Sequence, residues 1–65
     1  MKAKLVIEMD NAAFDTEGNG PNLELARILS EARAWCERSA ILTPGDEKIL
    51  MDVNGNRVGS LKITR

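Results

Sequence analysis

Residues Pro21–Arg38 read PNLELARILSEARAWCER, and this stretch decides the fold. Its apolar side chains recur at the spacing of one helical face, namely at Leu25, Ile28, Leu29, Ala32 and Cys36. Asn19-Gly20 interrupts the preceding chain, and proline suits a first helical turn. The pattern predicts a helix over 21–38. Because a helix of this length is marginal alone in water, its apolar stripe must pack against a sheet.

The opposite side of this predicted helix is charged. Glu24, Arg27 and Glu31 fall on that side, where they are expected to face solvent. Arg27–Glu31 and Arg33–Glu37 are spaced i, i+4, so each is expected to form an ion pair on the helix surface.

The residues before the helix alternate as a strand does. From Lys2 to Met9, one face would carry Ala3, Leu5, Ile7 and Met9, and the other Lys2, Lys4, Val6 and Glu8. This alternation predicts a half-buried strand. Residues 10–20 are rich in turn-forming residues and are predicted to form a loop, mobile over residues 17–20. Phe14, the only phenylalanine, is expected to fill the junction between helix and sheet.

The residues after the helix predict a β-hairpin. Glu47–Val53 and Asn56–Thr64 have the composition of strands, and Asn54-Gly55 between them is a strong hairpin-turn sequence. A two-residue loop and a three-residue loop with a bulge remain alternatives. The second is favoured because it would place Ile49, Met51, Leu61 and Ile63 together on the face that meets the helix.

These elements predict a single α+β domain over residues 1–65. The order is β-α-β-β, with one helix packed on a three-stranded antiparallel sheet. If the last strand lies in the middle, all neighbouring strands are antiparallel, which gives the spatial order 2-3-1.

The composition argues against an enzyme. The chain has no histidine and a single cysteine, so it can form no internal disulfide, and a reducing compartment is expected. We expect Cys36 to act as a small apolar side chain. There is no signal-peptide pattern and no apolar run long enough to span a membrane, so a soluble, cytoplasmic protein is expected. No cofactor and no metal are predicted.

Three short motifs resemble functional sites but have plainer interpretations. Residues 52–56 have oxygen ligands at alternate positions, as in a calcium loop, but the required later Gly and Glu are missing, which favours a hairpin turn. Asp10, Asp15 and Glu17 could form a cation site or an acid–base pair, but a flexible loop would not hold them at a fixed distance. Residues 18–20 precede a helix start, but they lack the lysine of a phosphate-binding loop.

The charge is unevenly distributed, although the net charge is only −1. Between Leu5 and Ala26 the chain has no Lys or Arg, and it carries Glu8, Asp10, Asp15, Glu17 and Glu24. These five residues predict an acidic end. It is either a solvated surface that aids solubility or a binding surface for a basic partner, because clustered carboxylates can imitate the phosphates of a nucleic acid.

Three phrases of the sequence resemble small proteins encoded by bacteriophages and mobile elements. They are residues 9–14 (MDNAAF), 25–29 (LARIL) and 51–59 (MDVNGNRVG). Small acidic proteins of such origin include the anti-CRISPR proteins, which inhibit Cas effector complexes by binding them. Anti-CRISPR proteins share no common motif, so the resemblance transfers no functional residue to this chain.

The resemblance implies a non-enzymatic inhibitor of a CRISPR-Cas or other anti-phage defence complex. The expected partner is a protein with a basic groove, a Cas effector subunit being suspected, and neither direct nucleic-acid nor membrane binding is expected. The chain would be a monomer or a small homo-oligomer. Two alternatives remain: an oligomer that sequesters a signalling nucleotide with Arg27, Arg33 or Arg57, and a structural or regulatory phage protein.

Overall fold

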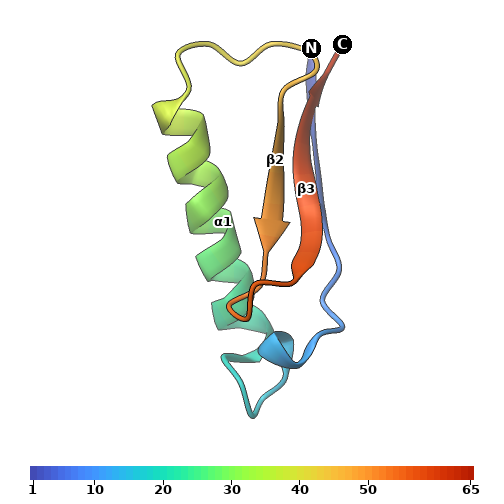
Figure 1. Ribbon diagram of the computed structural model, residues 1–65, viewed down its shortest axis with the longest axis vertical. Helices are drawn as coiled ribbons and strands as arrows, with labels where there is room; N and C mark the ends of the chain where they lie inside the picture. The colour runs from blue at the N-terminus through green and yellow to red at the C-terminus, as the bar shows by residue number, and fades with distance from the viewer.

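β3, at the end of the chain, occupies the middle of the sheet. The computed structural model describes all 65 residues, and its elements are β1 (Lys2–Ile7), the 3-10 helix η1 (Ala12–Phe14), α1 (Gly20–Arg38), β2 (Glu47–Met51) and β3 (Arg57–Thr64). β3 pairs antiparallel with β1 on one side and with β2 on the other (Figure 1). The predicted α+β fold, with one helix and the strand order 2-3-1, is therefore confirmed.

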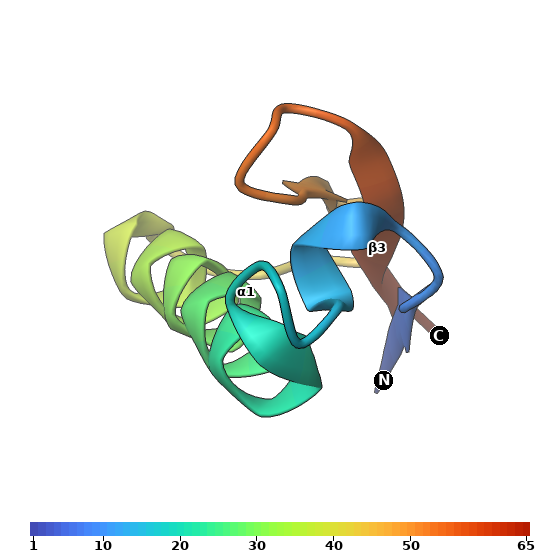
Figure 2. The ribbon, with the colours of Figure 1, turned by 90° about the horizontal axis from the view of Figure 1, so that it is seen from below.

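The hydrophobic core lies between the sheet and a layer made of α1 and η1. Viewed along the long axis, both helices lie on the same side of the strands (Figure 2). Ile28 from α1 and Leu50 from β2 are fully buried, and Phe14 from η1 is only 4% exposed. Phe14 packs into the same core cluster, so its predicted role at the helix–sheet junction is confirmed. Half-buried Cys36 packs against this cluster as an apolar side chain.

The buried face of α1 is rotated from the predicted stripe. Ile28 and Ala32 are buried as expected, but Leu29 is 40% exposed and Glu24 is completely buried. The buried positions therefore follow Glu24, Ile28 and Ala32 at a spacing of four residues. The prediction that Glu24 faces solvent is wrong, because it assumed that a carboxylate must be exposed and ignored the partners that satisfy this one.

β1 is shorter and more exposed than predicted. It ends at Ile7 rather than Met9, and Ile7 is its only residue that reaches even intermediate burial. Leu5 remains 45% exposed, although its partner Leu61 belongs to the core. The reason is the position of α1, which packs mainly against β2 and η1. β1 is therefore an open edge strand and not the half-buried strand that alternation predicted.

The hairpin has the predicted bulge, but the side chains of β2 that face the helix are not the predicted ones. Asp52 N–H donates to the Asn56 carbonyl, which encloses a three-residue loop, and the register shifts between Leu50 and Met51. Leu50 is fully buried, whereas Met51 is 47% exposed and Ile49 is only half-buried. The expected inward pair of Ile49 and Met51 is therefore wrong. A one-residue change of register moves every side chain of a strand to the other face, and Leu50 is the residue that meets the helix.

Candidate functional site: an acidic end beside a buried carboxylate

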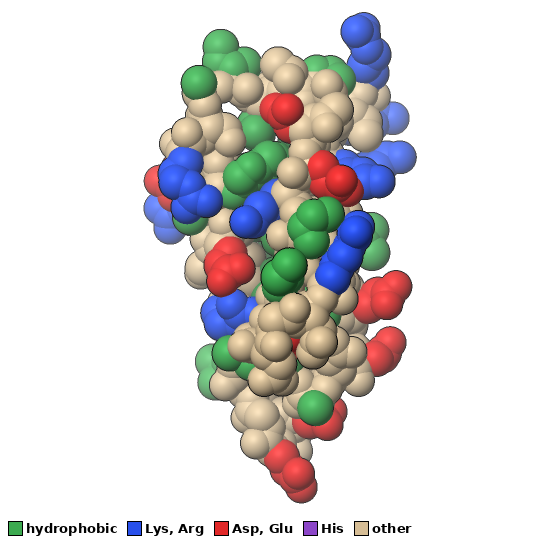
Figure 3. Space-filling model, viewed as in Figure 1, with side chains coloured by type: hydrophobic (Ala, Val, Ile, Leu, Met, Phe, Trp, Pro, Cys, Tyr) green, Lys and Arg blue, Asp and Glu red, His purple; other side chains and the backbone are tan.

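Four of the five predicted acidic residues are exposed near one end of the molecule. Glu8 and Asp10 follow β1, Asp15 follows η1, and Glu17 lies in the turn before α1. All four side chains are exposed. In Figure 3 the lower end of the molecule carries Asp and Glu side chains and no Lys or Arg. We call Glu8, Asp10, Asp15 and Glu17 the acidic end from here on.

The loop that carries these residues is held by backbone hydrogen bonds. Phe14 N–H donates to the Asn11 carbonyl, and the N–H groups of Gly18 and Gly20 both donate to the Asp15 carbonyl, at 3.0 and 2.9 Å. Burial of Phe14 anchors the loop to the core. These contacts tie Gly18 and Gly20 to Asp15. The mobility of residues 17–20 stays a prediction.

The four side chains of the acidic end differ from all other acidic side chains of the protein, because they have no ion-pair or hydrogen-bond partner within the chain. Ion pairs hold Glu24, Glu31, Glu37 and Glu47. Asp46 and Asp52 accept hydrogen bonds from backbone N–H groups. None of the four residues of the acidic end forms an ion pair or a side-chain hydrogen bond within the chain. Their charges are therefore free to interact with another molecule.

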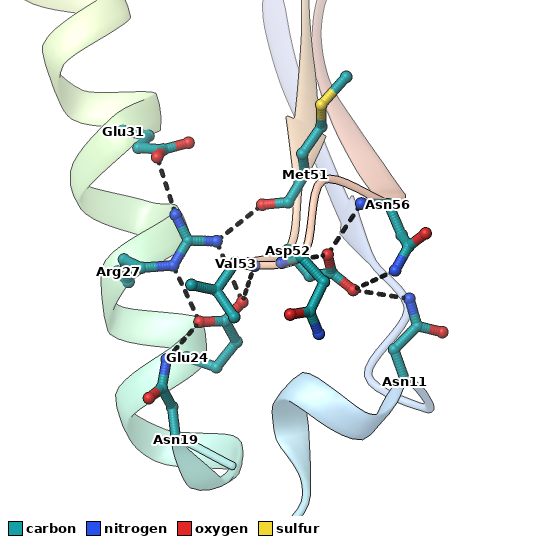
Figure 4. Close-up of polar contacts among 10 residues, drawn as sticks. Asn11, Asn19, Glu24, Arg27, Glu31, Met51, Asp52, Val53 and Asn56 are labelled. Atoms are coloured by element: carbon teal, nitrogen blue, oxygen red, sulfur yellow. Dashed lines mark hydrogen bonds and ion pairs between the residues drawn. The ribbon is translucent and has the colours of Figure 1, made fainter.

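Glu24, the fifth residue predicted to belong to this surface, lies inside the protein. Its carboxylate accepts hydrogen bonds from Arg27 Nε at 2.9 Å, Arg27 Nη2 at 3.0 Å, Asn19 Nδ2 at 3.1 Å and the Val53 backbone N–H at 2.8 Å (Figure 4). No free charge is left on this residue for a partner. The prediction that Glu24 is part of the binding surface is therefore corrected, and its role is to join α1 to the hairpin loop.

The partners of Glu24 keep it ionised although it is buried. The Arg27 guanidinium, together with Asn19 and Val53, lowers the pKa of the Glu24 carboxyl from 4.5 to about 2, against the opposing effect of burial. Arg27 also donates to Glu31 at 2.8 Å and to the Met51 carbonyl at 2.8 Å. One guanidinium thus links two turns of α1 to the end of β2.

A second buried carboxylate, Asp52, organises the hairpin loop. It accepts hydrogen bonds from the backbone N–H groups of Asn54 and Asn56, and from the side-chain amides of Asn11 and Asn56 (Figure 4). The Asn11 amide and these backbone donors lower the pKa of Asp52. Its oxygens bind N–H donors, as in a hairpin turn held by an aspartate, and not as in a calcium loop.

The sequence patterns predict neither the hydrogen-bond network around Glu24 nor the one around Asp52. Glu24 looks like any exposed glutamate in an amphipathic helix, and Asp52 looks like an ordinary turn residue. Only the Asp-x-Asn-Gly-Asn spacing contains a usable indication, because Asp side chains commonly bond to backbone N–H groups two residues later. The contacts of Asp52 with Asn11 and of Glu24 with Val53 join distant parts of the chain.

A shallow depression of about 290 Å³ lies between the acidic end and the hairpin loop. Its charged lining is Asp15 and Glu17, and Val53 and Asn54 form part of the opposite wall. The space is open to solvent and holds no histidine, lysine or arginine among its lining residues. Such a hollow suits the insertion of a positively charged side chain.

The three arginines of the nucleotide-binding alternative have different surroundings. Arg57, at the start of β3, is exposed and forms no ion pair. Arg27 is occupied by Glu24, Glu31 and the Met51 carbonyl. Arg33 pairs with Glu37 at 2.9 Å on the exposed side of α1, as the spacing predicts.

The structure brings no three Asp, Glu or Cys side chains together in an arrangement that would hold a metal ion.

Comparisons with known proteins give no relative from which a role could be transferred. No protein-family model matches the chain, and neither a curated protein nor a solved structure matches it. Its helix α1 lacks the combination of length and apolar character that crossing a membrane requires.

Proposed function

We propose that this protein is a non-enzymatic inhibitor that binds the basic nucleic-acid groove of another protein through its acidic end. The observation that carries the proposal is the contrast among its carboxylates. Glu8, Asp10, Asp15 and Glu17 are exposed and unpaired, whereas every other acidic side chain has a partner inside the chain. Unpaired surface carboxylates steer association with a Lys- and Arg-lined groove and compete with phosphates for it.

The hydrogen bonds of the loop and the burial of Phe14 support this proposal. A loop held by the Asp15 carbonyl and anchored by Phe14 loses little conformational freedom on binding. The depression beside Asp15 and Glu17 would receive a Lys or Arg side chain of the partner. The site is therefore better suited to protein recognition than to chemistry on a small molecule.

The partner class that we propose is a Cas effector subunit, so that the protein would act as an anti-CRISPR inhibitor in a bacterial host cell. The resemblance of the sequence to small phage-encoded proteins supports this choice. The alternative of a nucleotide-sequestering oligomer has less support, because Arg27 and Arg33 are already paired within the chain and only Arg57 is left unpaired.

The test is a competition experiment with purified DNA-targeting CRISPR effector complexes of several types. Binding of fluorescent target DNA is titrated with the wild-type protein and with the D10K/D15K/E17K variant. We expect the wild-type protein to weaken DNA binding of one complex, and the variant to need at least tenfold more protein for the same effect. The inhibition should also weaken as the salt concentration rises, because exposed charges are screened.

A matched control has the same change in net charge at a different place. The S30K/E37K/A40K/E47K variant makes the same change of six charge units at exposed positions outside the acidic end, where Glu37 and Glu47 form only surface ion pairs. It should inhibit within about threefold of the wild type if the position of the charge matters. Undiminished inhibition by D10K/D15K/E17K would disprove the role of the acidic end. A failure of the wild type on every complex would disprove the CRISPR target.

A further inference from the structure

β1 has a free edge whose backbone groups are ready to pair. Glu8 N–H donates to the Val58 carbonyl at 2.8 Å, so the even-numbered residues of β1 direct their backbone groups toward β3. In an antiparallel ladder the direction alternates, so the N–H and C=O groups of Ala3, Leu5 and Ile7 point away from the sheet. No proline interrupts this edge, and residues 2–6 are all exposed.

The other edge of the sheet is less available. The carbonyl of Met51, at the end of β2, already accepts a hydrogen bond from Arg27 Nη2 at 2.8 Å. α1 also packs mainly against β2 and the 3-10 helix η1. An added strand would therefore join the sheet at β1.

We propose that β1 pairs antiparallel with β1 of a second copy of this chain, which joins the two sheets into one. The register follows from the backbone. Only the arrangement with Leu5 opposite Leu5 of the second copy pairs all three outward-facing residues, since Ala3 then lies opposite Ile7 in both directions. This register forms about six backbone hydrogen bonds, two for each paired position.

The same register makes the charges complementary. Lys2 comes to lie opposite Glu8 of the second copy, and the pair occurs twice because of the two-fold symmetry. Both side chains are exposed, and neither forms an ion pair within its own chain. Opposite charges at directly opposed positions stabilise a strand pair, and like charges destabilise it.

Competing registers are less favourable. A shift that pairs Ala3 with Leu5 of the second copy places Lys4 opposite Lys4 and leaves Ile7 opposite Met1, outside the strand. The opposite shift sets Lys4 opposite Glu8 of the second copy, but it places Ala3 against Met9, beyond the end of β1, so only Leu5 and Ile7 pair within the strand. Lysines at a sheet edge normally prevent uncontrolled pairing. The register with Leu5 opposite Leu5 is favoured because it pairs all three outward-facing residues and also sets Lys2 opposite Glu8.

This dimer does not require the proposed inhibition, although it pairs Glu8, one of the four residues of the acidic end, with Lys2 of the second copy. Asp10, Asp15 and Glu17 lie outside the paired strand and stay exposed. Because the strands run antiparallel, the two copies would present these carboxylates at opposite ends of the joined sheet. The dimer test below involves no effector complex and no nucleic acid, so its outcome says nothing about inhibition.

The experiment is sedimentation velocity over a wide range of protein concentration. The wild type should show concentration-dependent dimerisation. K2E and E8K should each weaken it about tenfold or more, because each converts both ion pairs into repulsions. The two variants mixed together should associate, since one then carries acids and the other bases at the opposed positions. The double variant K2E/E8K should return to within about threefold of the wild type.

Two further variants make the test specific. K4E changes a charge of the same strand that faces Val6 in this register, so it should alter dimerisation less than threefold. A3P removes one outward N–H without removing a hydrogen bond to β3, and it should weaken the dimer while circular dichroism shows an unchanged fold. A wild type that stays monomeric at millimolar concentration overturns the proposal. So does an effect of K4E larger than that of K2E, or a K2E/E8K variant that remains monomeric.

Discussion

Replacing Glu24 with glutamine tests whether the buried carboxylate holds α1 to the hairpin. The amide keeps the size of the side chain but loses its charge, and it turns an N–H group toward the donors of Arg27 and Val53. Glu24 is fully buried, so water cannot replace the lost partner.

The magnitude follows from the pKa. A carboxyl whose pKa falls from 4.5 to about 2 on folding contributes about 3 kcal/mol to the stability at neutral pH. A domain of this size has a total stability of about 5 kcal/mol. E24Q should therefore lose more than half of the free energy of unfolding, and its Tm should fall by more than about 10 °C.

The pH dependence gives the same test a second readout. Because the folded pKa of Glu24 lies below its unfolded value, its contribution is complete above pH 4.5 and is lost as the pH falls toward 2. The difference in stability between the wild type and E24Q should therefore shrink across this range. The other buried carboxylate, Asp52, also has a lowered pKa, so some acid sensitivity should remain in E24Q.

The assay is urea unfolding followed by circular dichroism and by the fluorescence of Trp35 between pH 2.5 and 7. E37Q is the matched control, because Glu37 is also paired with an arginine on α1 but its side chain is 63% exposed. It should change the stability by less than about 0.5 kcal/mol. If E24Q loses no more than E37Q at pH 7, or if its loss is the same at pH 2.5, the reasoning about Glu24 is wrong.

Two further substitutions test how the sheet and the acidic loop are held. G59A should destabilise the fold by about 2 kcal/mol or more, since a Cβ at this position would overlap the Val6 carbonyl oxygen across the β1–β3 pair. The urea midpoint measures the loss, and an unchanged midpoint contradicts the close approach. F14A should cost about 3 kcal/mol or more, because the ring that anchors the acidic loop is almost fully buried. Unfolding of F14A by urea at the wild-type concentration would show that Phe14 packs weakly.

Local patterns in the sequence determined the elements and the class of fold. The helix predicted at 21–38 is observed at Gly20–Arg38, and the hairpin around Asn54-Gly55 forms with a bulge. These features depend on contacts between near neighbours, which periodicity and turn residues describe well. The requirement that all neighbouring strands be antiparallel also predicts the observed strand order.

The tertiary structure decided which side chains face inward and which charges remain free. Glu24 is buried because Arg27, Asn19 and the distant Val53 N–H surround its carboxylate together. Leu50, and not its neighbours, fills the core because the bulge sets the register of β2. A carboxylate is a surface group or a buried one according to the donors that the folded chain brings to it. Those donors come from residues far apart in the sequence, so no local pattern could distinguish Glu24 from the exposed Glu17.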